Sequence, residues 1–212
     1  SYRQVVLTLP EQLWTPFYQF KRRSILYSEF IKLAHECLQE VIRTMLRNNQ
    51  LKIAVIVFMH TNGRDSVYKP HLHVILGEGA FNPITTEWLR FTRIPLSLLR
   101  KAWQYHLLSM INRVLPGLER LVDYLWREYP DGFYAHPGDK DKVPTKSYRG
   151  LIKYLTKYLS SPPIALSRIV EFDGINVTYR YKSHRTKRME HETIDAVTFI
   201  GRMVQHIFPK GF

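Results

Sequence analysis

The alternation of apolar and polar side chains predicts strands in both halves of the chain. Residues 51–60 are apolar at almost every position, as in a buried strand, and the polar turn at 61–66 directs the chain into a second strand at 70–77. These two strands are expected to lie side by side and antiparallel. Further strands are expected at residues 2–9, 84–93, 133–136, 167–172 and 175–181, and a basic strand follows them.

Apolar positions spaced three and four residues apart predict helices between these strands. The longest helix is expected over residues 16–48, and a helix over 147–160 is stopped by Pro162 and Pro163. The other expected helices are 95–114, 117–128 and 193–206, and a mobile basic loop is expected at 137–146. This order of elements indicates an α+β fold, with a central antiparallel sheet flanked by helices and a single domain over residues 1–212.

Composition narrows the partners of this domain. The chain has 212 residues, 45% of them hydrophobic, and 31 Lys and Arg against 18 Asp and Glu give a net charge of +13. A field of this sign favours polyanions such as DNA. We expect no membrane partner, because no apolar run approaches the roughly 20 residues that span a bilayer and no signal peptide is visible. The single cysteine, Cys37, excludes internal disulfides and thiolate zinc clusters.

A pair of histidines is the first candidate for chemistry. His71 and His73 are one residue apart in the strand predicted at 70–77, so both side chains face the same way and could hold one ion. His60 ends the neighbouring predicted strand and could lie within reach of that ion. Three imidazoles suit Mn²⁺, Co²⁺, Ni²⁺ or Zn²⁺. The alternative is that His71 and His73 are partly buried with ordinary hydrogen bonds and that His60 is a strand-end histidine in solvent.

A pair of tyrosines is the second candidate. Tyr154 and Tyr158 are four residues apart in the helix predicted at 147–160, so their positions stack on one helical face. A tyrosine pair at this spacing can also be ordinary packing. Together with an ion held by imidazoles, however, two phenols indicate metal-assisted cleavage of a phosphodiester through a covalent tyrosine intermediate.

Several segments together carry a resemblance to a known family. The His71–His73 strand and residues 154–165, which hold the tyrosine pair, resemble the HUH endonuclease superfamily and, within it, the two-tyrosine transposases of rolling-circle bacterial insertion sequences. Further similar segments are residues 5–11, 179–182 and 206–212, so the resemblance covers nearly the whole chain. The resemblance implies a sheet of about five strands with the histidines on a middle strand. It also implies His60 as the third ligand, and Mg²⁺ or Mn²⁺ as the working divalent metal ion.

The resemblance also implies the reaction and its setting. The substrate would be single-stranded DNA at the element ends and at the target, and the product a 5′-phosphotyrosine with a free 3′-OH. Such proteins act in the bacterial cytoplasm, associated with the nucleoid, and usually carry an N-terminal Cys/His zinc module. Since no such module occurs here, we expect a catalytic domain excised from a longer protein. The oligomeric state is not indicated.

Basic side chains near these motifs are expected to bind the DNA backbone. Lys153 and Lys157 flank the tyrosines but point about 100° away from them, which favours phosphate binding over activation of a phenol. Aromatic and basic residues alternate at 179–182, a pattern typical of stacking platforms beside phosphate contacts or simply of a strand with one buried face. The full set of expected DNA-binding residues is Lys146, Arg149, Lys153, Lys157, Arg180, Lys182, Arg185, Lys187 and Arg188.

Three other functions remain open from the residues alone. A rolling-circle replication initiator or a relaxase would use the same chemistry. A hydrolytic nuclease would need the metal but no covalent adduct. A non-catalytic basic module that binds nucleic acid would use the histidines and tyrosines only for structure.

Overall fold

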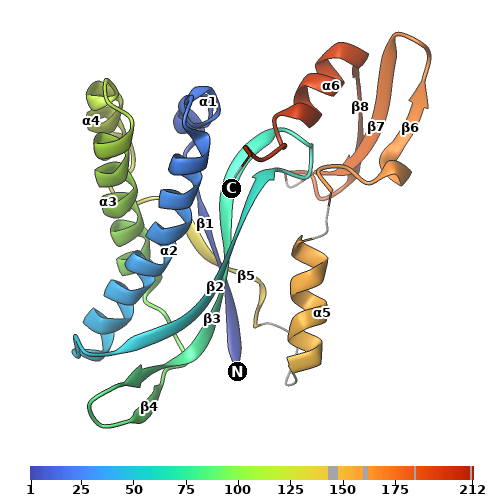
Figure 1. The fold of residues 1–212 in the computed structure, drawn as a ribbon. Helices are drawn as coiled ribbons and strands as arrows, with labels where there is room; N and C mark the ends of the chain where they lie inside the picture. The colour runs from blue at the N-terminus through green and yellow to red at the C-terminus, as the bar shows by residue number, and fades with distance from the viewer. Residues whose placement is uncertain (143–147, 160–161, 184, 211) are drawn as a thin grey trace.

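A five-stranded antiparallel sheet forms the centre of the molecule (Figure 1). The computed structural model describes residues 1–142, 148–159, 162–183, 185–210 and 212, with the backbone alone at 137–142, 148, 154 and 157–159. The strands of the sheet are β1 (Tyr2–Thr8), β2 (Lys52–Asn62), β3 (Tyr68–Asn82), β4 (Glu87–Arg90) and β5 (Ala135–Lys142). Their order is β2-β3-β1-β5, and β4 pairs with the end of β3. The predicted fold class, and the central place of the strand that carries His71 and His73, are confirmed.

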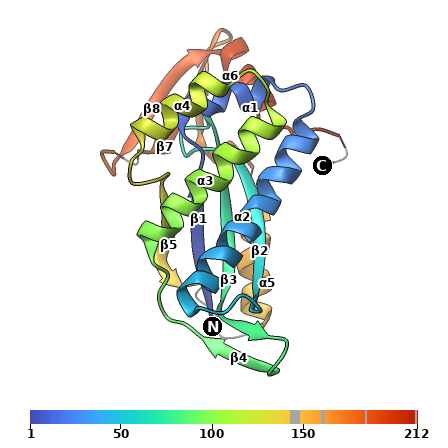
Figure 2. The same ribbon diagram turned by 90° about the vertical axis from the view of Figure 1, so that its left-hand side faces the viewer.

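Four helices cover one face of this sheet (Figure 2). They are α1 (Trp14–Gln19), preceded by a 3-10 turn at Glu11–Leu13, then α2 (Arg23–Leu46), α3 (Leu96–Val114) and α4 (Glu119–Glu128). The core lies between them and the sheet, where Leu72, Val74 and Leu76 of β3 are fully buried with Phe30 of α2 and Trp103 of α3. Each such side chain stabilises the fold by about 1.5–3 kcal/mol. The opposite sheet face is therefore the one left for other roles.

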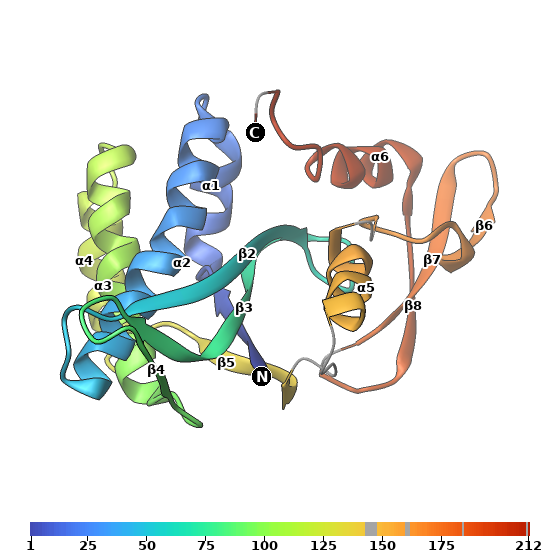
Figure 3. The same ribbon diagram turned by 60° about the horizontal axis from the view of Figure 1, so that its bottom comes forward.

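One helix, α5 (Tyr148–Leu159), lies on that opposite face (Figure 3). Its Leu151 and Leu155 pack against Phe58 of β2 and Ile75 of β3, which form a small apolar cluster separate from the main core. Residues i and i+4 of a helix share a face, so these two leucines form the contact stripe of α5. The helix is thus held to the sheet by a small apolar contact.

A second, three-stranded sheet follows α5. It contains β6 (Ile169–Phe172), β7 (Asn176–Lys182) and β8 (Met189–Asp195), all antiparallel, with a short 3-10 turn at Leu166–Arg168 before it and α6 (Ala196–Val204) after it. The predicted β6–β7 hairpin is confirmed: Gly174 takes a φ of +96°, which favours glycine. Asp195 caps α6 by accepting a hydrogen bond from the backbone N–H of Thr198 at 2.9 Å.

The turn between β2 and β3 joins the two sheets. The buried hydroxyl of Tyr179 on β7 lies 3.1 Å from the carbonyl oxygen of Asp65 and 2.6 Å from a carboxylate oxygen of Glu192. Arg202 of α6 donates to the same hydroxyl at 2.7 Å and pairs with Glu192 at 2.9 Å. His206 donates from Nε2 to the carbonyl of Ser66 at 2.9 Å. The second sheet is therefore fixed to the end of the hairpin that contains His60 and His71.

Several boundaries differ from the prediction. The helix expected over 16–48 is interrupted because Phe20 is extended, with ψ at 121°. The expected basic loop at 137–146 is wrong as far as residue 142, because β5 continues to there by pairing with β1. A strand does follow the β6–β7 hairpin as expected, but it is not basic: Arg185, Lys187 and Arg188 lie in the connection before β8. In the described part of the chain, we find no helix long and apolar enough to cross a membrane.

Candidate metal centre and the helix beside it

Three histidines meet on the sheet face that carries α5. His60 of β2 and His71 of β3 are direct cross-strand partners, and His73 follows two residues later on the same face. One ring nitrogen of each lies within 4.8 Å of one ring nitrogen of the others. The ring centroids are 4.7 Å apart for His60 and His73, 5.0 Å for His71 and His73, and 5.6 Å for His60 and His71. The β2–β3 register therefore assembles the cluster without help from distant segments.

The spacing of these nitrogens suits a single ion. The Nε2 atoms of His71 and His73 are 3.2 Å apart. Two nitrogens that each bind one ion at about 2.1 Å lie roughly 3.0–3.4 Å from each other in tetrahedral or octahedral geometry. All three imidazoles are half-buried, so solvent could still reach an ion bound between them. The donor set fits a divalent metal ion with positions left over for phosphate oxygens or water.

Hydrogen bonds at Nδ1 orient the imidazole rings of His71 and His73. His71 donates from Nδ1 to the backbone carbonyl of Lys69 at 2.7 Å, which places its proton on Nδ1 and leaves the Nε2 lone pair toward His73. The amide of Gln4 on β1 lies 2.8 Å from Nδ1 of His73. Partners of this kind fix the tautomer and direction of metal-binding histidines.

Burial keeps His73 uncharged. Loss of solvent, with smaller contributions from the neighbouring His71, His60 and His136, lowers its pKa to about 2. A neutral imidazole is the form that offers a lone pair to a metal. At neutral pH, His73 is therefore in the protonation state that metal binding requires.

The backbone of α5 aligns the tyrosine positions with its contact stripe. At about 100° per residue, positions 151, 154, 155 and 158 fall within an arc of about 100° on the helix. Leu151 and Leu155 of this arc contact Phe58 and Ile75, which are cross-strand and same-face neighbours of His73. Positions 154 and 158 thus belong to the side of α5 that faces the histidine-bearing face. The side chains of Tyr154 and Tyr158 lie outside the described part of the structure.

The expected DNA-binding residues fall into two groups. Arg149 and Lys153 are exposed on α5, while Lys146 and the side chain of Lys157 lie outside the described residues. The second group is exposed on β7 and in the β7–β8 connection and comprises Arg180, Lys182, Arg185, Lys187 and Arg188. A stacking role for Tyr179 is wrong, because this ring is fully buried and its hydroxyl is hydrogen-bonded.

Two residues near the histidines were not predicted. Gln4 is buried behind His73, and His136 of β5 lies in the same cross-strand row, separated from His73 by Val6. Both reach the face through β1, whose pairing with β3 and β5 joins segments about 70 and 130 residues apart. The sequence holds no distinguishing signal for Gln4, because Arg3 and Thr8 are also polar residues of the strand predicted at 2–9.

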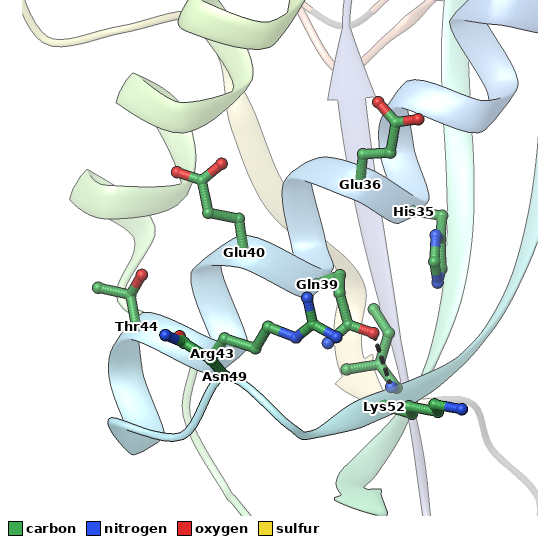
Figure 4. Close-up of a pocket in the computed structure, with 9 residues that line it drawn as sticks. His35, Glu36, Gln39, Glu40, Arg43, Thr44, Asn49 and Lys52 are labelled. Atoms are coloured by element: carbon green, nitrogen blue, oxygen red, sulfur yellow. Dashed lines mark hydrogen bonds between the residues drawn. The ribbon is translucent and has the colours of Figure 1, made fainter.

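A pocket of about 670 Å³ lies elsewhere and has a structural explanation. It lies between α2 and the start of β2, and its lining mixes both charges (Figure 4). Gln39 bridges the two elements by accepting from the backbone N–H of Ile53 at 3.2 Å and donating to the carbonyl of Leu51 at 2.9 Å. Eight residues of extended strand, or roughly 25 Å, separate Lys52 from His60. The polar side chain of Gln39 in this pocket therefore holds the α2–β2 connection in place, and the pocket is not part of the histidine cluster.

Comparison with known proteins finds relatives along the whole chain. Residues 54–212 match a family described as "Putative transposase", the Y2 transposases. The whole chain is 28% identical to part of the transposase for insertion sequence element IS801 from Pseudomonas savastanoi pv. phaseolicola, covering 52% of that protein. It is 25% identical to "Putative transposase y4qJ" of Sinorhizobium fredii, covering 56% of that protein. The chain thus spans about half the length of these relatives, and no solved structure matches it.

Proposed function

Because the chain belongs to the family of Y2 transposases, we propose that it cleaves single-stranded DNA at the ends of an insertion sequence and transfers the strand through a 5′-phosphotyrosine. One observation carries this proposal. The contact stripe of α5, formed by Leu151 and Leu155, lies on the sheet face where His60, His71 and His73 converge, and positions 154 and 158 fall in the same arc of the helix. The proposal accordingly assigns the two phenols and the three imidazoles to one active site.

In this proposal, the histidines hold a divalent ion, Mg²⁺ or Mn²⁺, that would polarise the scissile phosphate and offset the charge of the transition state. His71 and His73 are held for this role by Lys69 and Gln4, and His60 completes the set from β2. The face bears the neutral imidazole of His73 and the apolar side chains of Phe58 and Ile75, which do not repel a phosphodiester.

The tyrosine supplies the nucleophile. Its phenolic oxygen attacks phosphorus, the bond from phosphorus to the 3′ oxygen breaks, and the leaving 3′ oxygen takes up a proton. The phenol has an ordinary pKa of about 10, so its deprotonation must accompany the attack. A new 3′-OH reverses the reaction and releases the tyrosine, which conserves the bond energy without ATP. Two tyrosines would let one protein hold two DNA ends during strand transfer.

Basic side chains would bind the DNA backbone on either side of the cleaved bond. Arg149 and Lys153 on α5 would bind phosphates beside the cleaved bond, as would Lys146 and Lys157. The basic residues of β7 and the β7–β8 connection would bind the strand further away. We assign this chemistry to residues 1–212 as one catalytic domain, acting on DNA in the bacterial cytoplasm.

A denaturing gel tests the proposal. The chain is incubated with Mn²⁺ and labelled single-stranded DNA from the element ends, and a protein–DNA adduct that survives denaturation is expected. The adduct should be lost in Tyr154→Phe/Tyr158→Phe and in His71→Ala, and the single tyrosine variants should show which phenol attacks first. Tyr124→Phe and His35→Ala, both exposed on the helical layer, are matched controls that should retain it.

Other outcomes would contradict the proposal. Metal-dependent cleavage without an adduct would indicate a hydrolytic nuclease. Binding of the end sequence without any cleavage would indicate a module that only recognises DNA. An adduct that persists in the double tyrosine variant would move the nucleophile to another residue.

A further inference from the structure

A groove along the outer edge of β2 begins at the histidine cluster. It has a volume of about 300 Å³, near the lower end of the roughly 300–1,000 Å³ of small-molecule sites. Because it wraps the strand edge, its wall includes residues from both faces of β2, and His60 is one of them. Pro163, which follows α5, closes it from another side, together with His206, Phe208 and Phe212. The groove and the candidate metal centre thus share a side chain.

Two aromatic rings dominate the outer wall. Phe208 and Phe212 stack on each other with centroids 5.0 Å apart and planes 20° from parallel. Both remain 41% exposed, although each also contacts the edge or face of the buried Tyr27. A third flat ring could stack on these exposed phenylalanines. The added apolar contact would offset the small cost of moving the two rings.

Hydrogen bonds hold His206, two residues before Phe208, in a fixed position. His206 is buried, accepts from the hydroxyl of Thr61 at 3.1 Å and donates to the carbonyl of Ser66 at 2.9 Å. Burial lowers the pKa of this imidazole, so it stays neutral at physiological pH. The aromatic wall is therefore tied to the same hairpin that carries His60.

The side chains that line the groove indicate which kind of ligand it would bind. Among the described residues around the groove, none is Asp, Glu, Lys or Arg, so neither a phosphate nor a charged peptide finds an opposite charge there. Asn62 brings a primary amide, which can both donate and accept, and the rest is mostly apolar or aromatic. A neutral, flat ring with polar edges matches this combination, and DNA supplies such rings as its bases.

We propose that this groove, which we term the β2-edge groove, receives one nucleobase of single-stranded DNA next to the phosphate at the histidine cluster. The inference rests on the proposed function for its substrate class. Phe208 and Phe212 would stack on the base, and Asn62 would read its polar edge. Base–aromatic stacking of this kind is a general mode of binding single strands. The groove would thus contribute to the choice of cleavage position.

Abasic scanning tests the groove without requiring cleavage. The 212-residue chain is titrated, in EDTA, with fluorescent single-stranded oligonucleotides from the element end, each lacking one base. One position next to the cleavage site should weaken binding roughly 10-fold. In Phe208→Ala and Phe212→Ala, intact DNA should bind correspondingly less tightly, and removal of that base should no longer matter. Phe172→Ala, which removes a phenylalanine 60% exposed on β6, is the matched control.

The outcomes separate this inference from the proposed function. Equal losses at every abasic position, or unchanged affinity in Phe208→Leu, which keeps an apolar contact with Tyr27, would overturn the groove assignment even if adducts form. Loss of self-association in Phe208→Ala on sedimentation would overturn it in favour of a second copy as the occupant. A base effect that disappears in Phe208→Ala, without any adduct from wild-type protein, would uphold the groove and refute the proposed reaction.

Discussion

At the residue scale, Gln4 decides which nitrogen of His73 carries a proton. With its NH₂ group toward Nδ1, the imidazole must keep its hydrogen on Nε2, the atom 3.2 Å from Nε2 of His71. With the amide rotated by 180°, the carbonyl oxygen accepts from Nδ1–H, and Nε2 has a lone pair for a metal. Because its amide can either donate or accept, Gln4 can hydrogen-bond to Nδ1 of His73 both with and without a bound ion.

This role predicts that Gln4→Leu weakens Mn²⁺ binding roughly 10- to 100-fold, as expected for loss of a partner behind a metal-binding histidine. Gln4→Glu should retain most of the affinity, because a carboxylate accepts from Nδ1–H. Titration calorimetry measures both, with the exposed Gln12→Leu as control. Unchanged affinity in Gln4→Leu would remove Gln4 from the proposed site.

The lowered pKa of His73 predicts a dependence of stability on pH in the absence of metal. The unfolded imidazole takes up a proton below about 6.5, whereas the folded one does so only near 2, so stability falls as the pH drops between these values. The loss from this group should reach about 2 kcal/mol at pH 5. Urea unfolding in EDTA at pH 8 and pH 5 measures it. His73→Gln should lose less stability than wild type, and an equal loss in both would contradict the assigned cause.

The histidine triad could be predicted because it is local. A single turn between β2 and β3 sets the pairing of His60 with His71, and the two-residue repeat of a strand adds His73. Gln4 and His136 could not be predicted in the same way. Their approach depends on which residues of β1, β3 and β5 pair, and no short turn joins these strands to indicate that register.

At the element scale, α5 depends on its two leucines for its position. Leu151 and Leu155 contact Phe58 and Ile75, and this contact sets how α5 presents positions 154 and 158 to the histidine face. A displacement of about 1 Å can slow a reaction 100-fold while costing little stability. The efficiency of the proposed reaction should therefore respond more strongly than folding to changes in this stripe.

We predict that Leu151→Ala/Leu155→Ala speeds amide hydrogen exchange in α5, leaves exchange in α2 unchanged and lowers adduct formation at least 10-fold. Ile152→Ala changes a neighbouring side chain that is 56% exposed and should match wild type. Hydrogen exchange read by mass spectrometry, with the adduct gel on the same samples, provides both measurements. Wild-type exchange in α5 of the double variant would show that other contacts position the helix.

Helices and strands with a clear sequence pattern of their own lie where the sequence predicts them. α3, α4, α5 and the β6–β7 hairpin each have regular apolar spacing and a glycine or proline at a boundary. The far part of β5 was missed because Pro137, Gly138 and several charges oppose a strand locally, and only pairing with β1 makes it one. The interruption between α1 and α2 was missed for the converse reason, since apolar spacing continues through Phe20.

At the scale of the whole molecule, the net charge of +13 predicts binding that weakens steeply with salt. The slope of log affinity against log salt is about 0.7 per phosphate neutralised on a single strand. If all three side chains bind phosphate, Arg185→Ala/Lys187→Ala/Arg188→Ala should lower the slope by about 2. Fluorescence anisotropy across a salt series measures this.

An equal change of charge on the helical layer is the control for this experiment. Lys32, Lys101 and Arg120 are exposed on α2, α3 and α4, on the far side of the sheet from α5. Their combined replacement by alanine should leave the slope nearly unchanged. Equal effects of the two triple variants would mean that the overall field, and not the β7–β8 connection, attracts the DNA.

The local origin of the histidine triad also has an evolutionary consequence. Fourteen consecutive residues, from His60 to His73, encode all three imidazoles within a single hairpin. A hairpin can be inherited intact while surrounding loops lengthen, helices are replaced and whole domains are appended. Its vulnerability is of a different kind: one residue inserted into either strand turns every later side chain to the opposite face. Lineages that carry this hairpin are thus free to diverge widely in substitutions around it, yet are intolerant of insertions and deletions within its strands.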